Sequence, residues 1–284
     1  MIFLLSKKRL LQITVTFMIT AMVFVLHGKV RSSPVEIRPS QINGYVALVI
    51  DDFGSHREGV EEIINLGIPL TVAVMPFQPY SRSDAKAAHN AGLEVILHIP
   101  MEPKYGKPDW LGPKGITCNL SDKEIKSRIR TGLKELKWAA GMNNHMGSKA
   151  TQDRRVMKAV LQVAKEEKLY FLDSKTTPKS VVAEVSQSLG VDHFERDVFL
   201  DLIKSQAEIE AQLKRLAEIA LKRGYAVGIG HVGPEGGSVT ARAIRSMKPI
   251  LQAKGVRFVY LSELRKSTVK LRPIGTKPRT DIRP

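Results

Sequence analysis

From Gly44 onward, short runs of apolar and often β-branched residues alternate with longer segments in which apolar residues recur every three or four positions. Short runs bounded by turn residues predict strands, and the three-to-four spacing predicts helices with one apolar face. Several runs are continuous in Val, Ile and Leu, which is typical of strands buried on both faces of a parallel sheet. The predicted strands are Tyr45–Ile50, Leu70–Met75, Glu94–His98, Met142–His145, Leu169–Asp173, His193–Phe199, Tyr225–Ile229 and Arg257–Tyr260.

Amphipathic segments fall between these strands. Ser121-Asp-Lys-Glu124 fits a capping box, which predicts a helix from Ser121 to about Ala140. A second long helix is predicted to begin at Ser205 and to end at Gly224, because glycine suits the position just past a helix. The remaining predicted helices are Ser55–Leu66, Ser81–Ala91, Asp153–Glu167, Pro178–Leu189 and Ser238–Lys254.

This alternation of strands and helices predicts one α/β domain over residues 44–264. An open, doubly wound sheet would give a similar pattern. Polar residues that could support catalysis, however, follow many of the strands, whereas a doubly wound sheet would gather them at one point of strand reversal. Their distribution favours a distorted (β/α)7-type barrel, in which the carboxyl ends of all strands share one rim.

Composition and charge limit the classes of partner. The chain is 43% hydrophobic and 6% aromatic, so a substantial core is expected but rows of stacked aromatic side chains are not. Its net charge of +16 is concentrated at the ends: residues 1–43 carry six Lys or Arg against one Glu, and residues 265–284 carry seven against one Asp. Charge in such tails fits solvated ends or an anionic surface, so we expect no nucleic-acid partner and a basic, disordered tail over 265–284.

The first thirty residues predict export. Lys7, Lys8 and Arg9 precede a mostly apolar run of 17 residues from Leu10 to Leu26, which is typical of a secretory signal. No clean cleavage site follows, so an uncleaved membrane anchor is the second interpretation. The run is near the lower length limit for a spanning helix. A buried core helix is the third interpretation. Either form of export places the body in the periplasm, free or anchored to the inner membrane, with residues 31–43 as a linker.

Polar clusters close five of the predicted strands. On one barrel rim, residues about 180 positions apart in sequence could surround a single cavity. The clusters are Asp51-Asp52, His98 followed by Glu102, Asn143-Asn144-His145 followed by Ser148, Asp173-Ser174, and His231.

The adjacent carboxylates of Asp51 and Asp52 point to a metal or to acid–base chemistry, because two neighbouring carboxylates raise one pKa unless a cation neutralises them. An isolated aspartate such as Asp173 is more often a helix N-cap. Aspartate and histidine without cysteine suit zinc or another divalent cation with a position open for water. With Cys118 as the single cysteine, an intramolecular disulfide and a thiolate zinc site are excluded.

Taken in order along the chain, these motifs resemble the divergent polysaccharide deacetylase family, an outlying branch of the NodB-like carbohydrate esterases. The resemblance covers roughly residues 44–264 and implies a distorted NodB-like barrel that hydrolyses acetyl groups on glycans with a divalent metal. The motifs are Ile50-Asp-Asp-Phe-Gly54, His98-Ile-Pro-Met-Glu102-Pro, Asn144-His-Met-Gly-Ser148, Phe171-Leu-Asp-Ser174 and Ile229-Gly-His-Val.

The resemblance also implies roles. It makes Asp51 the general base, His231 the general acid, and Asp52 and His98 metal ligands. The second histidine of the family's His-x-x-x-His motif is replaced here by Glu102, so the third ligand is either Glu102 or His145, and we favour His145. Further candidates for the site are Asp173, Asn144 and Ser148.

These roles predict an exported, zinc-dependent hydrolase that removes acetyl groups from a cell-envelope glycan. A barrel that binds glycan or an envelope protein without catalysis is the alternative, motivated by the departures at Glu102 and after the fourth strand. Another metal-dependent amide hydrolase on the same scaffold is a third interpretation. The sequence does not fix the oligomeric state.

Overall fold

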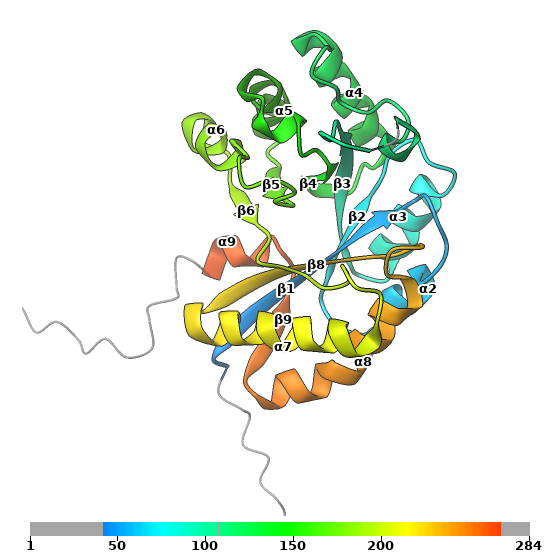
Figure 1. Cartoon of the computed structure of the whole chain (residues 1–284), viewed down its shortest axis with the longest axis vertical. Coiled ribbons are helices and arrows are strands. Elements are labelled where there is room, and N and C mark those ends of the chain that lie inside the picture. Colours follow the sequence, from blue (N-terminus) through cyan, green and yellow to red (C-terminus); the bar gives the residue numbers. More distant parts are fainter. Residues whose placement is uncertain (1–41, 107, 268–284) are drawn as a thin grey trace, which may run out of the picture. The chain divides into compact units, whose positions relative to one another are not determined.

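The structure, a computed structural model, describes residues 42–106 and 108–267. Within them, one parallel sheet of nine strands carries helices on its outer face (Figure 1). Hydrogen bonds order the strands β6-β5-β4-β3-β2-β1-β8-β7, and β9 pairs with β1. The strands are β1 (Gly44–Phe53), β2 (Thr71–Val74), β3 (Glu94–Met101), β4 (Ala139–Met146), β5 (Tyr170–Asp173), β6 (His193–Glu195), β7 (Val198–Phe199), β8 (Tyr225–His231) and β9 (Val256–Val259).

Helices alternate with these strands, so the predicted α/β class is confirmed. The α-helices are α2 (Val60–Ile64), α3 (Ser81–Asn90), α4 (Asp122–Glu135), α5 (Arg154–Glu166), α6 (Val182–Leu189), α7 (Gln206–Arg223), α8 (Gly237–Ala253) and α9 (Glu263–Ser267). Two short 3-10 helices are η1 (Pro108–Leu111) and η2 (Ala150–Gln152). None of the helices in the described part of the chain combines the length and the apolar character needed to cross a bilayer.

Three of the expected segments lie wholly or largely outside the residues that the structure describes. Residues 1–30, expected to be a signal peptide or anchor, lie outside the described residues. The same holds for residues 31–41 of the expected linker and residues 268–284 of the expected basic tail.

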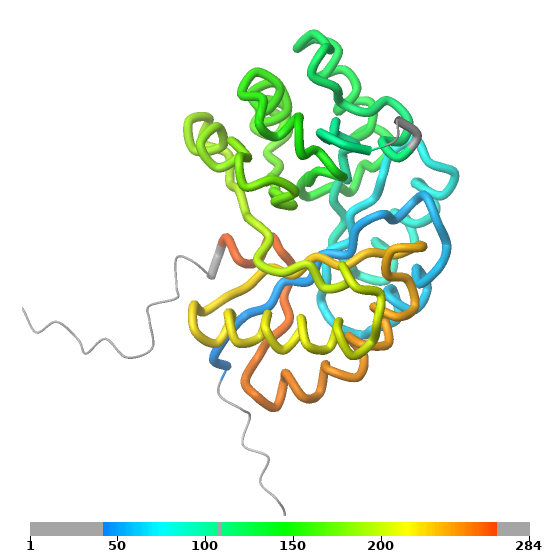
Figure 2. Tube along the Cα trace, in the orientation of Figure 1, coloured from blue at the N-terminus to red at the C-terminus, as the bar shows by residue number. Residues whose placement is uncertain are grey.

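The sheet curls into the distorted barrel that was expected. Only Arg196 and Asp197 separate β6 from β7, the two ends of the hydrogen-bonded strand order, so one stretch of chain joins the two edges (Figure 2). The Arg196 N–H donates to the Asp173 carbonyl on one side, at 3.1 Å, and the Asp197 N–H to the Val227 carbonyl on the other, at 2.9 Å. Counting β6 and β7 as one interrupted strand gives seven positions around the curl, with β9 paired beside the first residues of β1.

The two faces of the strands bury different cores. Because side chains alternate along a strand, Val46, Leu48 and Ile50 of β1 point outward into the large core beneath the helices. Ala47 and Val49 point inward, where they join a smaller core inside the barrel. Burial on both faces explains why the strands read as continuous apolar runs.

One end of the barrel interior is closed. The Tyr170 ring fills the space beside Gly141, where an added Cβ would lie 2.3 Å from the ring. The Tyr170 hydroxyl donates to Glu94 Oε1 at 2.8 Å, so its polar end is satisfied although the residue is fully buried. Leu261 and Leu264, at the end of the described chain, belong to the same inner core. The opposite end, at the carboxyl ends of the strands, is left for the functional site.

Three predicted helices are shorter than expected, and one of them, expected over Pro178–Leu189, begins only at Val182. The helix expected over Ser55–Leu66 begins only at Val60, because Gly59 is left-handed (φ 82°) and lies so close to Gly237 that a side chain there would clash. The helix expected to reach Ala140 ends at Glu135, because Leu136 turns into the core and β4 begins at Ala139. Its start is as predicted, since Ser121 and Glu124 form both bonds of the capping box.

Candidate active site

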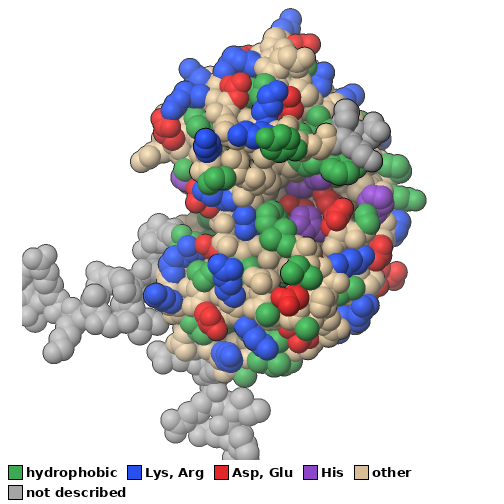
Figure 3. Space-filling view, in the orientation of Figure 1, with side chains coloured by type: hydrophobic (Ala, Val, Ile, Leu, Met, Phe, Trp, Pro, Cys, Tyr) green, Lys and Arg blue, Asp and Glu red, His purple; other side chains and the backbone are tan. Residues whose placement is uncertain are grey.

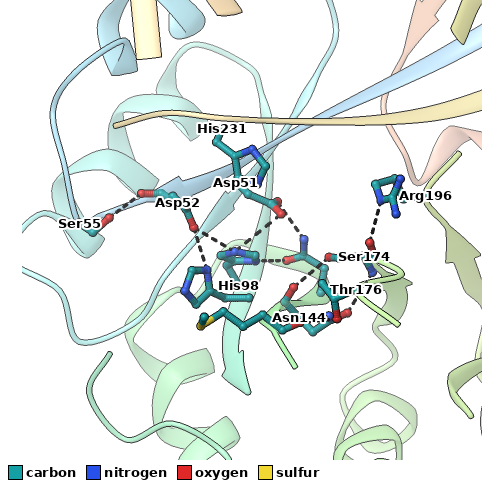
Figure 4. Close-up of polar contacts among 12 residues, drawn as sticks. Asp51, Asp52, Ser55, His98, Asn144, Ser174, Thr176, Arg196 and His231 are labelled. Carbon is teal, nitrogen blue, oxygen red and sulfur yellow. Dashed lines mark hydrogen bonds and ion pairs between the residues drawn. The ribbon is translucent and has the colours of Figure 1, made fainter. Parts of the chain in front are cut away.

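The inner face of the barrel changes from apolar to polar at the carboxyl ends of its strands. Asp51 follows Val49 on the inner face of β1, His98 follows Ile96 on β3, and His231 follows Ile229 on β8. β1 and β8 are paired so that Asp51 and His231 lie side by side, and β3 and β4 so that His98 lies beside Asn143. The alternation that builds the inner core therefore delivers these side chains to one place (Figure 4).

Asp52 reaches the same place by a local distortion. Strand alternation would direct it away from Asp51, so the backbone must bend if both carboxylates are to face one site. The bend is at Asp52 itself, which is left-handed (φ 69°), and the pairing register with β2 shifts between Ile50 and Phe53. Such a bulge re-aims a side chain, and a non-glycine residue in this conformation carries backbone strain of the kind that functional sites retain.

Asp52, His98 and His145 form a group whose ligand atoms all lie within 4.8 Å of one another. Asp52 Oδ1 is 3.0 Å from His145 Nδ1 and 3.3 Å from His98 Nε2. Within the described residues, no other set of three His, Cys, Asp or Glu side chains is arranged in this way. Two imidazoles and one carboxylate are a typical zinc donor set with room for a further ligand.

The surroundings of His145 and Asp52 test whether a cation fits this group. His145 Nε2 lies 3.1 Å from the Trp110 carbonyl, which can only accept, so the neutral ring keeps the lone pair on Nδ1, facing Asp52. Asp52 Oδ1 is buried and receives no well-directed hydrogen bond. A lone pair facing an orphaned carboxylate oxygen is the arrangement that a cation between them would satisfy, so the residues fit the metal that the family resemblance implies.

Charge and burial separate the two aspartates. Burial alone would raise the pKa of Asp52, but the close approach of the His145 and His98 imidazoles outweighs it and holds that pKa well below its usual range. For Asp51 burial dominates over the opposing charges of His98 and His231, so its pKa is raised. Asp52 therefore suits a permanently charged ligand, and Asp51 a group that takes up a proton.

His231 is held by a carboxylate that the sequence analysis did not single out. Asp201 Oδ1 lies 2.8 Å from His231 Nδ1, and Asp201 Oδ2 accepts from the His231 N–H at 2.7 Å and from the Thr240 hydroxyl at 2.7 Å. Burial would lower the pKa of His231, but the bond to Asp201 and the charges of Asp201, Asp52 and Asp51 raise it to about 9. The Phe199 ring stacks on the imidazole with centroids 5.7 Å apart, which fixes its plane.

Three other candidate residues, Glu102, Ser148 and Asp173, lie outside the metal group. Glu102 does not join the metal group: Oε2 accepts from the Cys118 N–H at 2.6 Å and Oε1 from the Lys149 ammonium at 2.6 Å. Ser148 accepts from the Lys104 N–H at the surface. Asp173 is buried, and Oδ1 accepts from the Lys175 N–H, so it shapes a turn and caps no helix.

Asn144 lines the cavity, but its amide serves the loops. Its Oδ1 accepts from the Ser174 N–H at 3.0 Å, and its Nδ2 donates to the Met146 carbonyl at 2.7 Å. The Ser174 carbonyl in turn accepts from Arg196 Nε at 2.8 Å. Asn144 therefore ties the ends of β4 and β5 together beside the site.

Two connected hollows open around these residues. The first, of about 320 Å³, is lined by the acidic pair, the three histidines and Asp201. The second, of about 710 Å³, starts at Asp52 and His145 and continues between Trp110, Met75, Pro79 and Pro234. Figure 3 shows the histidines and acidic side chains at the base of this depression in the surface. A small polar chamber thus opens into a larger groove with apolar walls.

Asp201 was missed at the sequence level, and Asn143 was named there only as part of a strand-end cluster, without a role, although both residues carried usable signals. Asp201 stands two residues beyond the predicted strand His193–Phe199, so the strand-end criterion applied to other clusters would have included it. Asn143 stands two residues before His145 and therefore on the same face of β4. What no local pattern shows is that its amide meets Asp51, which is 92 positions away.

A family model described as divergent polysaccharide deacetylase matches residues 48–265. The uncharacterized protein YibQ of Escherichia coli strain K12 is 33% identical over 253 residues, which is 89% of this chain and 77% of that protein. An uncharacterized protein of Agrobacterium tumefaciens C58 has a similar structure, with a TM-score of 0.71 and 23% identity over 79% of this chain and 90% of that one. The peptidoglycan deacetylase PdaC from Bacillus subtilis shares the fold with a TM-score of 0.50 and 14% identity, over 82% and 95% of the two chains.

Proposed function

Because the chain belongs to the divergent polysaccharide deacetylase family, we propose that it is a metal-dependent hydrolase that removes acetyl groups from a cell-envelope glycan. The observation that carries the proposal is the grouping of Asp52, His98 and His145 in one chamber with Asp51 and His231. The chamber thus combines a candidate cation site, a base and an acid, which is the set that acyl hydrolysis requires.

Asp52, His98 and His145 would hold the cation, and zinc is the ion their donor atoms suit best. A cation there supplies polarisation of the acyl carbonyl and a more acidic water molecule. The Asp51 carboxylate, 3.7 Å from His98 Nε2, lies beside the same point and takes the proton from the attacking water. Its raised pKa suits that task, because a base with too low a pKa would not accept the proton.

His231 acts on the other side of the reacting bond. Its Nδ1 is engaged by Asp201, so Nε2 is the nitrogen available to the chamber. The imidazolium donates the Nε2 proton to the leaving amine of an N-acetyl group or the leaving alkoxide of an O-acetyl group. Asp201 fixes the ring and stabilises its positive charge throughout.

The groove beyond the metal group suits a sugar chain. Trp110 is 57% exposed on one wall, and an indole face packs well against the apolar face of a pyranose ring. Ser55, Gln78 and Glu235 add polar groups that could bond sugar hydroxyls. This combination of apolar walls with a few polar groups is typical of sites for small ligands and oligosaccharides.

The test combines metal analysis with acetate release. Purified chain would be loaded with zinc and assayed on peptidoglycan and on N- and O-acetylated oligosaccharides. We expect one bound zinc and acetate release in the native chain, and loss of both in Asp52→Ala and His98→Ala. An exposed histidine outside the chamber, as in His89→Ala, is the matched control. A folded native chain that takes up no stoichiometric divalent metal would sink the proposal.

The alternative, a glycan-binding barrel without catalysis, has a distinct signature. It predicts tight glycan binding that is unchanged by Asp51→Asn, with no acetate released from any acetylated substrate. Another amide hydrolase would instead release an amine from substrates without acetyl groups, so the same panel separates the three functions.

The location proposed for this activity is the periplasm, either free or tethered to the inner membrane. It rests on the basic residues Lys7 to Arg9 followed by the apolar run Leu10–Leu26. A reporter enzyme that is active only after export, fused after Asn43, should be active. Replacing Val23 by arginine in the same fusion should abolish that activity, because a charge in the apolar run opposes insertion.

A further inference from the structure

Asn143 lies between the candidate base and a candidate metal ligand. Its side chain is fully buried near the carboxyl end of β4. The amide Nδ2 donates to Asp51 Oδ1 at 2.9 Å, and the amide Oδ1 lies 2.7 Å from His98 Nδ1. One planar group therefore touches two residues that come from different strands and have different chemical tasks.

The chemistry of the neighbours fixes which way the amide points. An ionised carboxylate only accepts hydrogen bonds, so the NH₂ end of Asn143 must face Asp51. The carbonyl end then faces His98 Nδ1, and an amide oxygen only accepts, so Nδ1 must carry the proton. In the neutral ring this leaves the lone pair on Nε2, which lies 3.3 Å from Asp52 Oδ1 in the metal group.

We propose that Asn143 is a positioning residue for both halves of the site: its NH₂ group holds the base Asp51, and its carbonyl selects the form of His98 that can bind a metal. The part that concerns the base rests on the function proposed above, whereas the part that concerns His98 does not. Ligand histidines commonly donate their second N–H to a fixed acceptor, which sets ring orientation and metal affinity. Here the acceptor is shared with the base.

The proposal explains why an amide is needed at this position. A carboxylate could accept from His98 but could not donate to Asp51, and it would add a second negative charge there. An aliphatic side chain could do neither and would leave two buried polar groups unsatisfied. Asn143→Asp therefore removes only the donation to Asp51, whereas Asn143→Leu removes both the donation to Asp51 and the acceptor for His98.

The experiment measures three properties of the native chain, Asn143→Asp and Asn143→Leu at pH 8, with the exposed Asn90→Asp as charge-matched control. Side-chain ¹⁵N shifts of His98 in the metal-free protein report its tautomer, competition with a chromophoric chelator reports zinc affinity, and acetate release reports turnover. Thermal unfolding verifies that each variant is folded.

We expect the Nδ1–H form of His98 in the native chain and in Asn143→Asp, with zinc affinity equal within about tenfold, while turnover of Asn143→Asp falls at least 100-fold. In Asn143→Leu the preference for Nδ1–H should disappear and zinc affinity should fall about 10- to 100-fold. Unchanged tautomer and zinc affinity in a folded Asn143→Leu would overturn the proposal, as would normal turnover of Asn143→Asp. If the native chain releases no acetate from any substrate, the hydrolase function fails, and the tautomer and zinc measurements still decide the role of Asn143 toward His98.

Discussion

At the scale of the residue, the bond between Asp201 and His231 sets the charge of the proposed acid. The pKa of His231 is raised from 6.5 to about 9, so the imidazolium is the form present at neutral pH. Activity that depends on this proton should hold below that pKa and fall as the pH rises through it. The same proton stabilises the fold: its contribution is complete below about pH 6.5 and is lost as the pH rises through about 9.

Asp201→Asn should move the alkaline fall in kcat to lower pH, because removing the carboxylate lets the pKa of His231 drop toward its ordinary value. The measurement is the pH profile of acetate release at saturating substrate, with zinc bound. Thr240→Val, which removes a bond to Asp201 but keeps its charge, should shift the profile less. An identical alkaline limb in the native chain and Asp201→Asn would contradict the assignment of His231 as the acid.

Single residues also show where reasoning from sequence stops. The adjacent aspartates and the histidines at three strand ends line one chamber, because the carboxyl ends of the strands share one rim of the barrel. The distinct environments of Asp51 and Asp52 could not be foreseen, since they depend on a left-handed backbone at Asp52 and on an amide from β4. Glu102 matched a family spacing, but β3 ends at Met101 and the following turn delivers its carboxylate to Cys118 and Lys149.

At the scale of the element, the segment around η1 joins the metal group to the groove. The Trp110 carbonyl contacts His145, while its side chain lines the groove wall. Trp110→Ala keeps the backbone contact and removes the indole from the groove wall. We expect KM for an acetylated oligosaccharide to rise about tenfold with kcat nearly unchanged, since a stacked aromatic side chain contributes roughly 1–2 kcal/mol to binding.

The control for Trp110→Ala is Tyr105→Ala. Tyr105 is 89% exposed in the same connection, yet it lines neither hollow. Steady-state kinetics on one oligosaccharide and its monosaccharide would separate the two variants. Equal KM values for the native chain and Trp110→Ala would remove this wall from the substrate site.

The closed end of the barrel depends on one close contact between β4 and β5. Gly141→Ala would place a methyl group against the Tyr170 ring, so we expect a loss of about 1–3 kcal/mol in the free energy of unfolding. Adding Tyr170→Leu should recover part of that loss, giving non-additive effects measurable by urea denaturation. Strictly additive losses would indicate that the ring moves aside at no cost.

Elements differ in how well the sequence predicts them. The strands were predicted well, because burial on both faces leaves an apolar run that is independent of distant contacts. Helix limits were predicted less well, because they depend on such contacts. Gly59 against the backbone of Gly237 delays α2, and the return of Leu136 to the core shortens α4. The break between β6 and β7 follows from Arg196 and Asp197 bonding to strands on opposite sides.

At the scale of the whole molecule, metal binding should be measurable as stability. An ion that binds only the folded chain, at a free concentration one hundred times its Kd, stabilises by about 2.7 kcal/mol. For a domain of this size that corresponds to a Tm increase of roughly 5–10 °C. Scanning calorimetry with zinc and with a chelator should show this difference in the native chain and not in His145→Ala. A native Tm that is indifferent to zinc would contradict the metal site.

Both ends of the described chain lie at the closed end of the barrel. Asn43 donates to the Gly255 carbonyl where β1 starts, and Leu264 of α9 packs into the inner core beside Val259. The active-site rim is a strand length away, about 25 Å along β1. A barrel coupled to a solid support at Asn43 or at Leu264 would therefore present its open mouth to the solution. Immobilised molecules would share one orientation, and a large, insoluble polymer could reach every mouth without displacing the attachment.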